Sequence, residues 1–230
     1  MVLLARPDGR IQVMTKAIIF DFDGVIVESV DIKTKAFARL FEQEGREVVE
    51  KVVDYHLKNG GMSRFDKFRY YYKEILNRPL PEQKFEELCN SFSELVMEEV
   101  VNAPYVKGSK EFLDKYYNVY PCFVATGTPQ EEIDEIIKQR GMIHYFKKVF
   151  GAPKKKDVIV RDIINGYSLN PYEVIYVGDA MSDYQAAYEN SVRFIARIHD
   201  NESIFKEVEC IKIMDLTGLG RIINENADTG

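Results

Sequence analysis

The chain contains no tryptophan, only three histidines and only three cysteines among its 230 residues. Cys89, Cys122 and Cys210 lie far apart and form no CxxC pair, which argues against a disulfide framework or a zinc knuckle. A run of about 18 apolar residues, the length that spans a membrane, is also absent. The formal net charge is −6, so the basic face typical of nucleic-acid binders is not expected. We therefore expect neither a membrane nor a nucleic-acid partner.

Residues 1–13 hold only a short apolar patch at 2–4 and lack the hydrophobic core of a signal peptide. Together with the unpaired cysteines, this favours a cytoplasmic location. Met14 begins the segment that leads into the first strand, and whether residues 1–13 belong to the native product stays open.

Apolar strands alternate with helical patterns over much of the chain. Residues 17–20 form a continuous apolar run, and residues 119–125, 148–150, 174–177 and 191–198 show strands separated by helical segments. Strands spaced by ten or more helical residues are typical of right-handed crossovers. The sequence predicts an α/β fold, a Rossmann-like parallel sheet with helices on both faces.

The stretch between the first two strands is different, because it carries only helical patterns. Helices are predicted at residues 31–44, at 48–57, at 65–75 with Ser63 as N-cap, and from Pro81 to about residue 100. We expect an all-helical cap domain at residues 31–103, inserted into a core domain formed by residues 14–30 and 104–230.

Acidic residues follow two of the predicted strands. Asp21 and Asp23 come after the first strand, and Asp179 and Asp183 follow the strand at 174–177. Taken alone, the first pair is better explained as acidic turn residues, and the second is only suggestive, because a turn followed by a helix N-cap also explains it. Together at one sheet edge, the four carboxylates would repel one another by a few kcal/mol per pair at an effective dielectric constant of about 20. A cation is therefore expected. Oxygen ligands favour Mg²⁺.

Thr126 ends the strand at 119–125 and is followed by Gly127 and Thr128. Its hydroxyl and the next backbone N–H groups could bind a phosphate at the helix N-terminus, although the segment alone fits an ordinary strand–turn–helix joint. One lysine of residues 154–156 could neutralise a phosphate and a carboxylate. Lys156 is preferred because it lies nearest the helix start, and Lys155 is second.

With these segments in order, residues 15–215 resemble the haloacid dehalogenase superfamily, particularly its phosphoglycolate phosphatase-like branch with a helical cap. Residues 21–25 look like its first motif, Thr126 its second, a lysine at 154–156 its third, and residues 178–183 its fourth. The resemblance implies that Asp21 attacks phosphorus and forms an aspartyl-phosphate. It implies that Asp23 protonates the leaving oxygen and then deprotonates water. Dehalogenases of this superfamily lack an aspartate there, so Asp23 favours phosphoryl chemistry.

The resemblance also places a substrate-specificity loop at residues 60–64. Arg64 could bind an anionic or hydroxylated part of the substrate, although a solvent-exposed residue of the first helical turn explains it equally well. The segment at 28–33 is expected to be the hinge into the cap. His56, His144 and His199 lie outside the motifs and receive no catalytic role.

The predicted function is that of a Mg²⁺-dependent phosphatase acting on a small phosphorylated metabolite, such as phosphoglycolate or a sugar phosphate. A phosphomutase resembling β-phosphoglucomutase and a non-catalytic phosphometabolite-binding protein remain alternatives. A protein substrate is less favoured, because a cap would cover the site. The substrate, and the choice between monomer and homodimer, stay open.

Overall fold

The computed structural model describes residues 4–5, 11–12, 14–199 and 204–228. Its centre is a six-stranded parallel sheet in the order β5-β4-β3-β6-β7-β8, which confirms the predicted α/β class. The strands are β3 (Ala17–Phe20), β4 (Cys122–Pro129), β5 (Lys148–Ala152), β6 (Val174–Gly178), β7 (Arg193–Arg197) and β8 (Ile211–Ile213). Strand β8 was not predicted from the sequence. A separate antiparallel pair, β1 (Leu4–Ala5) and β2 (Ile11–Gln12), was not predicted either.

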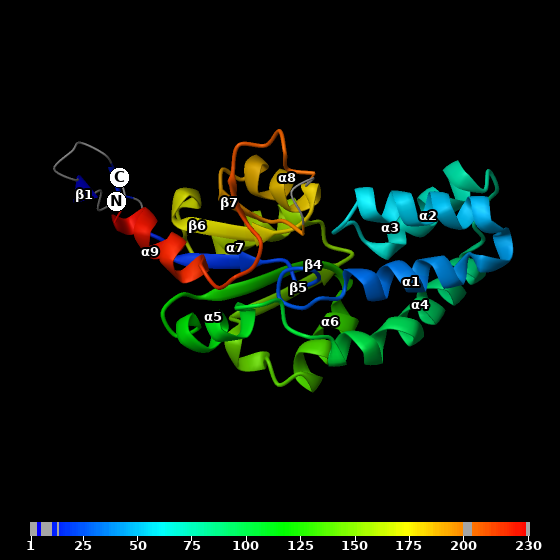
Figure 1. Cartoon of the computed structure of the whole chain (residues 1–230), viewed down its shortest axis with the longest axis horizontal. Helices are drawn as coiled ribbons and strands as arrows, with labels where there is room; N and C mark the ends of the chain where they lie inside the picture. Colours follow the sequence, from blue (N-terminus) through cyan, green and yellow to red (C-terminus); the bar gives the residue numbers. More distant parts are fainter. Residues whose placement is uncertain (1–3, 6–10, 13, 200–203, 229–230) are drawn as a thin grey trace.

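Helices cover both faces of the sheet (Figure 1). Alternate side chains of β3 point to opposite faces, so Ile18 and Phe20 pack in one apolar cluster while Ala17 and Ile19 pack in another. The first cluster includes residues of α5 (Ser109–Tyr116), α6 (Gln130–Gln139) and α9 (Leu219–Asp228), and the second those of α7 (Lys156–Gly166) and α8 (Met181–Glu189). The strands are buried on both sides, as their continuous apolar runs predict.

Four helices lie beyond one end of the sheet (Figure 1). They are α1 (Val30–Leu40), α2 (Arg46–Lys58), α3 (Arg64–Tyr70) and α4 (Glu82–Asn102), with a 3₁₀ turn at Glu42–Glu44 and a π-helical turn at Tyr71–Ile75. The predicted helices therefore form, and the Ser63 hydroxyl accepts the Asp66 N–H as an N-cap. We call these four helices the helical block.

Apolar residues at helical spacing in the sequence place Phe65, Phe68, Tyr72 and Ile75 on the buried face of the third predicted helix, and this register is partly wrong. The buried side chains there are those of Arg64, Lys67, Phe68, Tyr71 and Tyr72, whereas Phe65 and Ile75 are only partly buried. The buried face therefore begins one residue earlier, at the first residue of α3. Tyr71 and Tyr72 follow the buried Lys67 and Phe68 by four residues each, so both tyrosines lie on this face.

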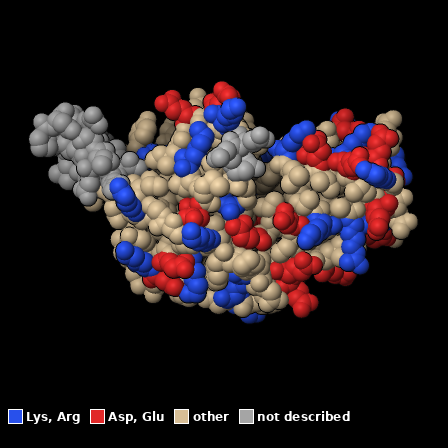
Figure 2. Space-filling model, in the orientation of Figure 1, with Lys and Arg blue, Asp and Glu red and all other residues tan. Residues whose placement is uncertain are grey.

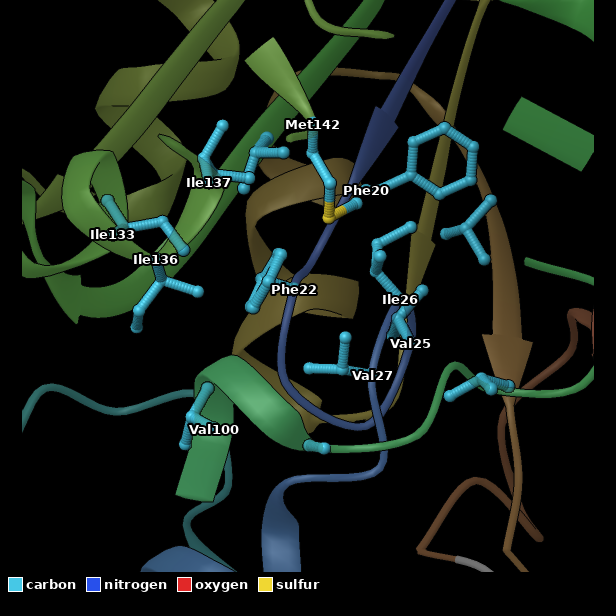
Figure 3. Packing of buried hydrophobic residues seen from close by; sticks show 14 of the residues in the cluster. Phe20, Phe22, Val25, Ile26, Val27, Val100, Ile133, Ile136, Ile137 and Met142 are labelled. Carbon is cyan, nitrogen blue, oxygen red and sulfur yellow. The ribbon is translucent and has the colours of Figure 1, made fainter. Parts of the chain in front are cut away.

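One apolar cluster runs from the helical block into the sheet. Phe37 of α1 lies 5.7 Å from Phe68 and 4.4 Å from Phe92 between ring centroids, and all three belong to the same cluster as Phe20 and Phe22. Figure 3 shows the segment after β3 packed against α4 and α6. The side chains of this segment that it labels, besides Phe22, are Val25, Ile26 and Val27, all fully buried. This packing fixes the backbone that carries the first acidic pair.

The chain enters and leaves the helical block at one place. Val27 and Tyr105 form an isolated antiparallel bridge. The Glu28 N–H donates to the Pro104 carbonyl at 2.9 Å, and the Val106 N–H donates to the Ile26 carbonyl at 3.0 Å. The two crossing segments therefore hold each other by backbone hydrogen bonds.

Acidic and basic side chains are intermixed on the face in Figure 2. The outer side of α2 carries three ion pairs at i,i+4 spacing, between Arg46 and Glu50, Glu47 and Lys51, and Asp54 and Lys58. Such pairs are typical of a solvated helix face. None of the described helices is both long and apolar enough to cross a membrane.

Candidate active site

Three neighbouring strands bring the predicted site residues together. The strands β4, β3 and β6 are adjacent and parallel, so their carboxyl ends share one edge of the sheet. Thr126 lies in the last part of β4, Asp21 directly follows β3, and Asp179 directly follows β6. The Asp21 N–H donates to the Val177 carbonyl at 2.9 Å, which continues the ladder as far as the aspartate. Ligands bind beyond this edge in open parallel sheets.

Carboxylate oxygens of Asp21, Asp179 and Asp183 lie within 4.8 Å of one another. Gly24 permits this approach, since a Cβ at that position would lie 2.1 Å from Asp179 Oδ2, and its φ of +75° also favours glycine. Three carboxylate oxygen donors, with Asp21 and Asp183 buried and Asp179 partly exposed, suit a hard divalent cation such as Mg²⁺, because the set holds neither sulfur nor imidazole. The predicted fourth metal ligand, Asp23, is not part of this group.

Lys156 lies inside the acidic group. Its Nζ is 2.8 Å from Asp21 Oδ2 and 2.6 Å from Asp183 Oδ1, and its side chain is 7% exposed. Lys154 instead pairs with Asp162 at the surface, and Lys155 is the N-cap residue of α7. Of the three candidate lysines, the structure therefore brings Lys156 to the carboxylates.

Burial and charge act in opposite directions on these groups. Burial raises the pKa of Asp21 to about 7 against the attraction of Lys156, and the negative charges of Asp183 and Asp23 add to the increase. Burial alone would lower the pKa of the Lys156 ammonium, but Asp183 and Asp21 raise it above its usual value. Burial also raises the pKa of Asp179 and of Asp183. Carboxylates that resist ionisation without further positive charge are a reason to expect a cation.

The tyrosine of strand β6 supports the acidic group from behind. The hydroxyl of Tyr176 lies 2.8 Å from Asp183 Oδ1 and 3.2 Å from the Ala125 carbonyl. It has one proton to donate, and an ionised carboxylate is the stronger acceptor. Asp183 Oδ1 therefore accepts hydrogen bonds from both Tyr176 and Lys156. From the sequence, Tyr176 was expected only as part of an apolar strand.

Asp23 points to a different set of partners. Its Oδ1 accepts from the Ser29 hydroxyl at 2.6 Å, and its Oδ2 accepts from Lys33 Nζ at 2.5 Å and from the Thr128 hydroxyl at 2.9 Å. Burial would raise the pKa of Asp23, but Lys33 lowers it to about 2. Lys33 also donates to the Thr128 hydroxyl at 2.7 Å. Lys33 was predicted only as part of a hinge, and its place one turn into α1 is what turns it toward the strand ends.

The loop before α3 lies directly over the strand ends. A Cβ on Gly127 would be 2.5 Å from the Gly61 carbonyl, and a Cβ on Gly61 would be 2.8 Å from Lys156 Nζ. Below it, the Thr126 hydroxyl accepts the Thr128 N–H at 3.2 Å, and both threonines are buried. The predicted phosphate segment is thus covered by the predicted specificity loop.

Arg64 has a structural partner. Its Nη2 lies 2.5 Å from Glu132 Oε1 of α6, its Nη1 donates to the Ser93 hydroxyl at 2.7 Å, and its guanidinium lies 4.3 Å from the Phe92 ring centroid. The side chain is 4% exposed, so the alternative of a solvent-exposed residue is wrong. Its role as a substrate ligand stays a prediction.

A cavity of about 440 Å³ lies between the helical block and the strand ends. Its lining includes Asp23, Asp179 and Gly127 at the strand ends, together with four cationic side chains, Lys33, Arg64, Lys67 and Arg197. Two histidines to which the sequence analysis gave no role also line it, namely His56 and His199, the latter with Nε2 3.1 Å from Asp179 Oδ2. The carboxylates of Glu28 and Asp31 line it as well, so the cavity carries charges of both signs.

Comparisons with known proteins give a family and several relatives. The model of the haloacid dehalogenase-like hydrolases matches residues 18–197. A phosphoglycolate phosphatase of Mannheimia succiniciproducens is 25% identical over 183 residues, which cover 75% of this chain and 81% of that protein. A second phosphoglycolate phosphatase, from Aliivibrio fischeri, is 25% identical over 181 residues, 75% of this chain and 79% of that protein.

A solved β-phosphoglucomutase from Clostridium difficile has a TM-score of 0.75 at 19% identity, covering 94% of this chain and 98% of that one. At identities this low, the likeness to a solved structure shows the fold alone.

Proposed function

The chain belongs to the haloacid dehalogenase-like hydrolase family, and from this we propose that it is a Mg²⁺-dependent phosphatase of a small phosphorylated metabolite, with Asp21 as its nucleophile. The observation that carries the proposal is the position of the Asp21 carboxylate. It is 2% exposed, lies at the end of the central strand β3, and is held by Lys156 at 2.8 Å beside two further carboxylates.

The first step joins a carboxylate oxygen of Asp21 to phosphorus while the bond from phosphorus to the substrate oxygen breaks. The Asp21 side chain is already oriented, since its Oδ1 accepts the Phe22 N–H at 2.7 Å and its Oδ2 accepts from Lys156. The Lys156 ammonium offsets the charge that a carboxylate and a phosphate bring together. The Thr126 hydroxyl and the backbone N–H groups of the next residues are the donors proposed for the phosphate oxygens.

The second step is hydrolysis of the aspartyl-phosphate by water, and Asp23 is the proposed acid and base. It first gives a proton to the leaving oxygen and then takes one from the attacking water. Lys33 lowers the pKa of Asp23 to about 2, so in the arrangement seen here the carboxylate is ionised and suited to accept a proton from water. The ion pair between Lys33 and Asp23 therefore favours the ionised state of Asp23 that the second step requires.

Asp21, Asp179 and Asp183 are the residues that would hold Mg²⁺, because they form a compact group of oxygen donors. When bound, the ion would screen the negative charges of these carboxylates and of the phosphate. The side chain of Asp23, predicted as a ligand, is left for proton transfer.

The helical block at residues 31–103 is the proposed cap, and residues 14–30 and 104–230 form the proposed core domain. The loop of the cap at Gly61 lies over Lys156, and this cover excludes bulk water from the phosphoryl group. Both curated relatives are named as phosphoglycolate phosphatases, which supports a small phosphorylated substrate such as phosphoglycolate or a sugar phosphate. The three free cysteines support a cytoplasmic location.

The test is phosphate release from a panel of phosphorylated metabolites by the purified protein with MgCl₂. Asp21→Asn keeps the shape of the side chain and removes the nucleophile, so we expect it to abolish release, as EDTA should. Asp54→Asn, at a side chain 60% exposed on α2, is the matched control and should retain full activity. Activity that survives Asp21→Asn would refute the assigned nucleophile.

The panel also separates the alternatives. A phosphomutase would convert a sugar phosphate only when a sugar bisphosphate is added, and little free phosphate would appear. A phosphometabolite-binding protein would bind members of the panel without releasing phosphate. Either result would replace the phosphatase proposal.

A further inference from the structure

The cavity has an end that the phosphoryl chemistry does not use. Lys67 of α3 and His56 of α2 both line it, and their side chains are 2% and 6% exposed. Lys67 Nζ lies 2.8 Å from His56 Nδ1, 5.5 Å from the Phe37 ring centroid, and the imidazole lies 4.8 Å from the same ring. Both residues come from the helical block, so they face the strand ends across the cavity.

Lys67 differs from the other cations of the cavity in its partners. Lys33 is paired with Asp23, Arg64 with Glu132, and Arg197 with Glu28. Among the residues that the structure describes, no carboxylate lies within ion-pair distance of Lys67. An ammonium has three N–H donors, and the hydrogen bond to His56 uses one of them. The remaining positive charge and donors are available to a ligand.

His56 can hold this ammonium only as a neutral base. Burial, and after it the positive charge of Lys67, lower the pKa of His56 to about 2. Its Nδ1 therefore accepts the hydrogen bond from Lys67, which assigns the proton to Nε2. His56 thus orients Lys67 without neutralising it. Burial also lowers the pKa of Lys67 to about 7, because an unpaired charge is costly in this site. A bound anion would remove that cost.

The chemistry of this end selects between the two substrate types proposed above. A sugar ring presents hydroxyl donors that need acceptors, whereas the groups here are an ammonium donor and the rings of Phe37 and Phe92. The Lys67 ammonium beside the Phe37 ring matches one negative charge on a short carbon chain. The cavity volume of about 440 Å³ lies toward the lower end of small-molecule sites, which suits a short substrate.

We infer that Lys67, oriented by His56, binds a carboxylate at the end of the substrate remote from the phosphate, so that the substrate is a short phosphorylated carboxylic acid. This inference rests on the proposed phosphatase function and deepens it. Lys67 is a specificity-determining residue, and His56 is a positioning residue that acts through it.

A matched pair of substrates isolates the carboxylate. 2-Phosphoglycolate and 2-hydroxyethyl phosphate differ only in a carboxylate against a hydroxymethyl group. We expect wild type to prefer the acid. Lys67→Met keeps the length of the side chain and should lower kcat/KM for 2-phosphoglycolate on the order of 10- to 100-fold, the loss of one charged hydrogen bond. It should lower kcat/KM for 2-hydroxyethyl phosphate far less, so that the preference for the acid is lost, whereas Lys67→Arg should recover part of the preference.

Lys73→Met is the matched control, because Lys73 lies close by in the helical block and its side chain is 82% exposed. It removes the same charge from the surface and should change neither substrate. A wild-type preference for 2-hydroxyethyl phosphate or for glucose 1-phosphate would overturn the inference. An equal loss of kcat/KM on 2-phosphoglycolate and 2-hydroxyethyl phosphate in Lys67→Met would overturn it as well. The wild-type comparison needs no variant and tests the substrate class even where Lys67→Met does not fold, and Lys67→Arg then tests the residue.

Binding separates this inference from the phosphatase proposal. Calorimetric titration of Asp21→Asn with 2-phosphoglycolate measures the subsite without turnover. If wild type releases no phosphate but binding is weakened by adding Lys67→Met, the subsite is supported and the phosphatase is refuted. If binding does not depend on Lys67, the subsite is refuted whatever the activity.

Discussion

The ion pair between Arg64 and Glu132 joins the helical block to the sheet domain through the protein interior, and its removal gives a sharp prediction. The two side chains are 4% and 5% exposed, and the N–O distance is 2.5 Å. Glu132→Leu would leave the guanidinium buried with only the Ser93 hydroxyl and the Phe92 ring as partners. Loss of one partner of a buried pair costs about 3–5 kcal/mol, because the other charge stays desolvated.

For a chain of this size, each kcal/mol shifts Tm by about 2–4 °C, so Glu132→Leu should lower Tm by about 6–20 °C. Urea unfolding followed by circular dichroism gives the same loss as a free energy. Arg64→Met should cost a similar amount, while the double variant should recover most of the loss, because no charge then remains buried.

Glu135→Gln on the same helix is the control. Glu135 is 41% exposed and pairs with Lys138 at the surface, where an ion pair contributes about 0–1 kcal/mol. A Glu132→Leu variant within about 1 kcal/mol of wild type, or a double variant no more stable than the single ones, would refute the reasoning. Either result would mean that water reaches the pair from the cavity and screens it.

Three further predictions follow from single contacts. Tyr176→Phe removes one hydrogen bond to Asp183 and should lower kcat by about tenfold with little change in KM, since one bond to a charged group is worth about 1.5 kcal/mol. His56 has its pKa lowered from 6.5 to about 2, so the unfolded chain binds more protons below pH 6.5 and stability is lost as pH falls. The free energy of unfolding of wild type relative to His56→Gln should therefore drop by about 1.4 kcal/mol per pH unit below pH 6.5, and parallel curves in urea titrations at pH 6.5, 5.5 and 4.5 would contradict this. MgCl₂ at about 100 times its Kd should stabilise wild type by about 2.7 kcal/mol, and Asp179→Asn should reduce the rise in Tm; an equal rise in both would place the ion elsewhere.

The sheet and the acidic group could be predicted because local patterns determine them. Continuous apolar runs ending in Asp21 or Gly178 indicate buried strands, and parallel strands bring their carboxyl ends to one edge whatever the loops between them. The preference for Lys156 over its neighbours followed from helix geometry alone. These inferences need only periodicity and topology.

The residues of the helical block were harder to predict, because their roles depend on which helix face meets the cavity. Arg64 and Lys67 of α3 and Tyr71 of the π-helical turn lie at i, i+3 and i+7 on one buried face, where sequence reasoning expects apolar side chains. The charged residues Arg64 and Lys67 at this spacing could have indicated a face turned toward a polar cavity. The predicted buried face began one residue late, at Phe65 instead of Arg64. Lys33 was missed because its partners, Asp23 and Thr128, come from two other segments.

The short backbone clasp between Val27 and Tyr105 has a consequence for how such a chain can diversify. The residues between Val27 and Tyr105 form an insertion in the sheet domain, and its two ends are held together by the backbone hydrogen bonds that flank this bridge. The entropy of closing a loop grows only slowly with its length, so a helical block of different size or sequence could replace this one without changing the strand order. Substrate choice can then evolve in one module while the reacting carboxylates stay in place in the other.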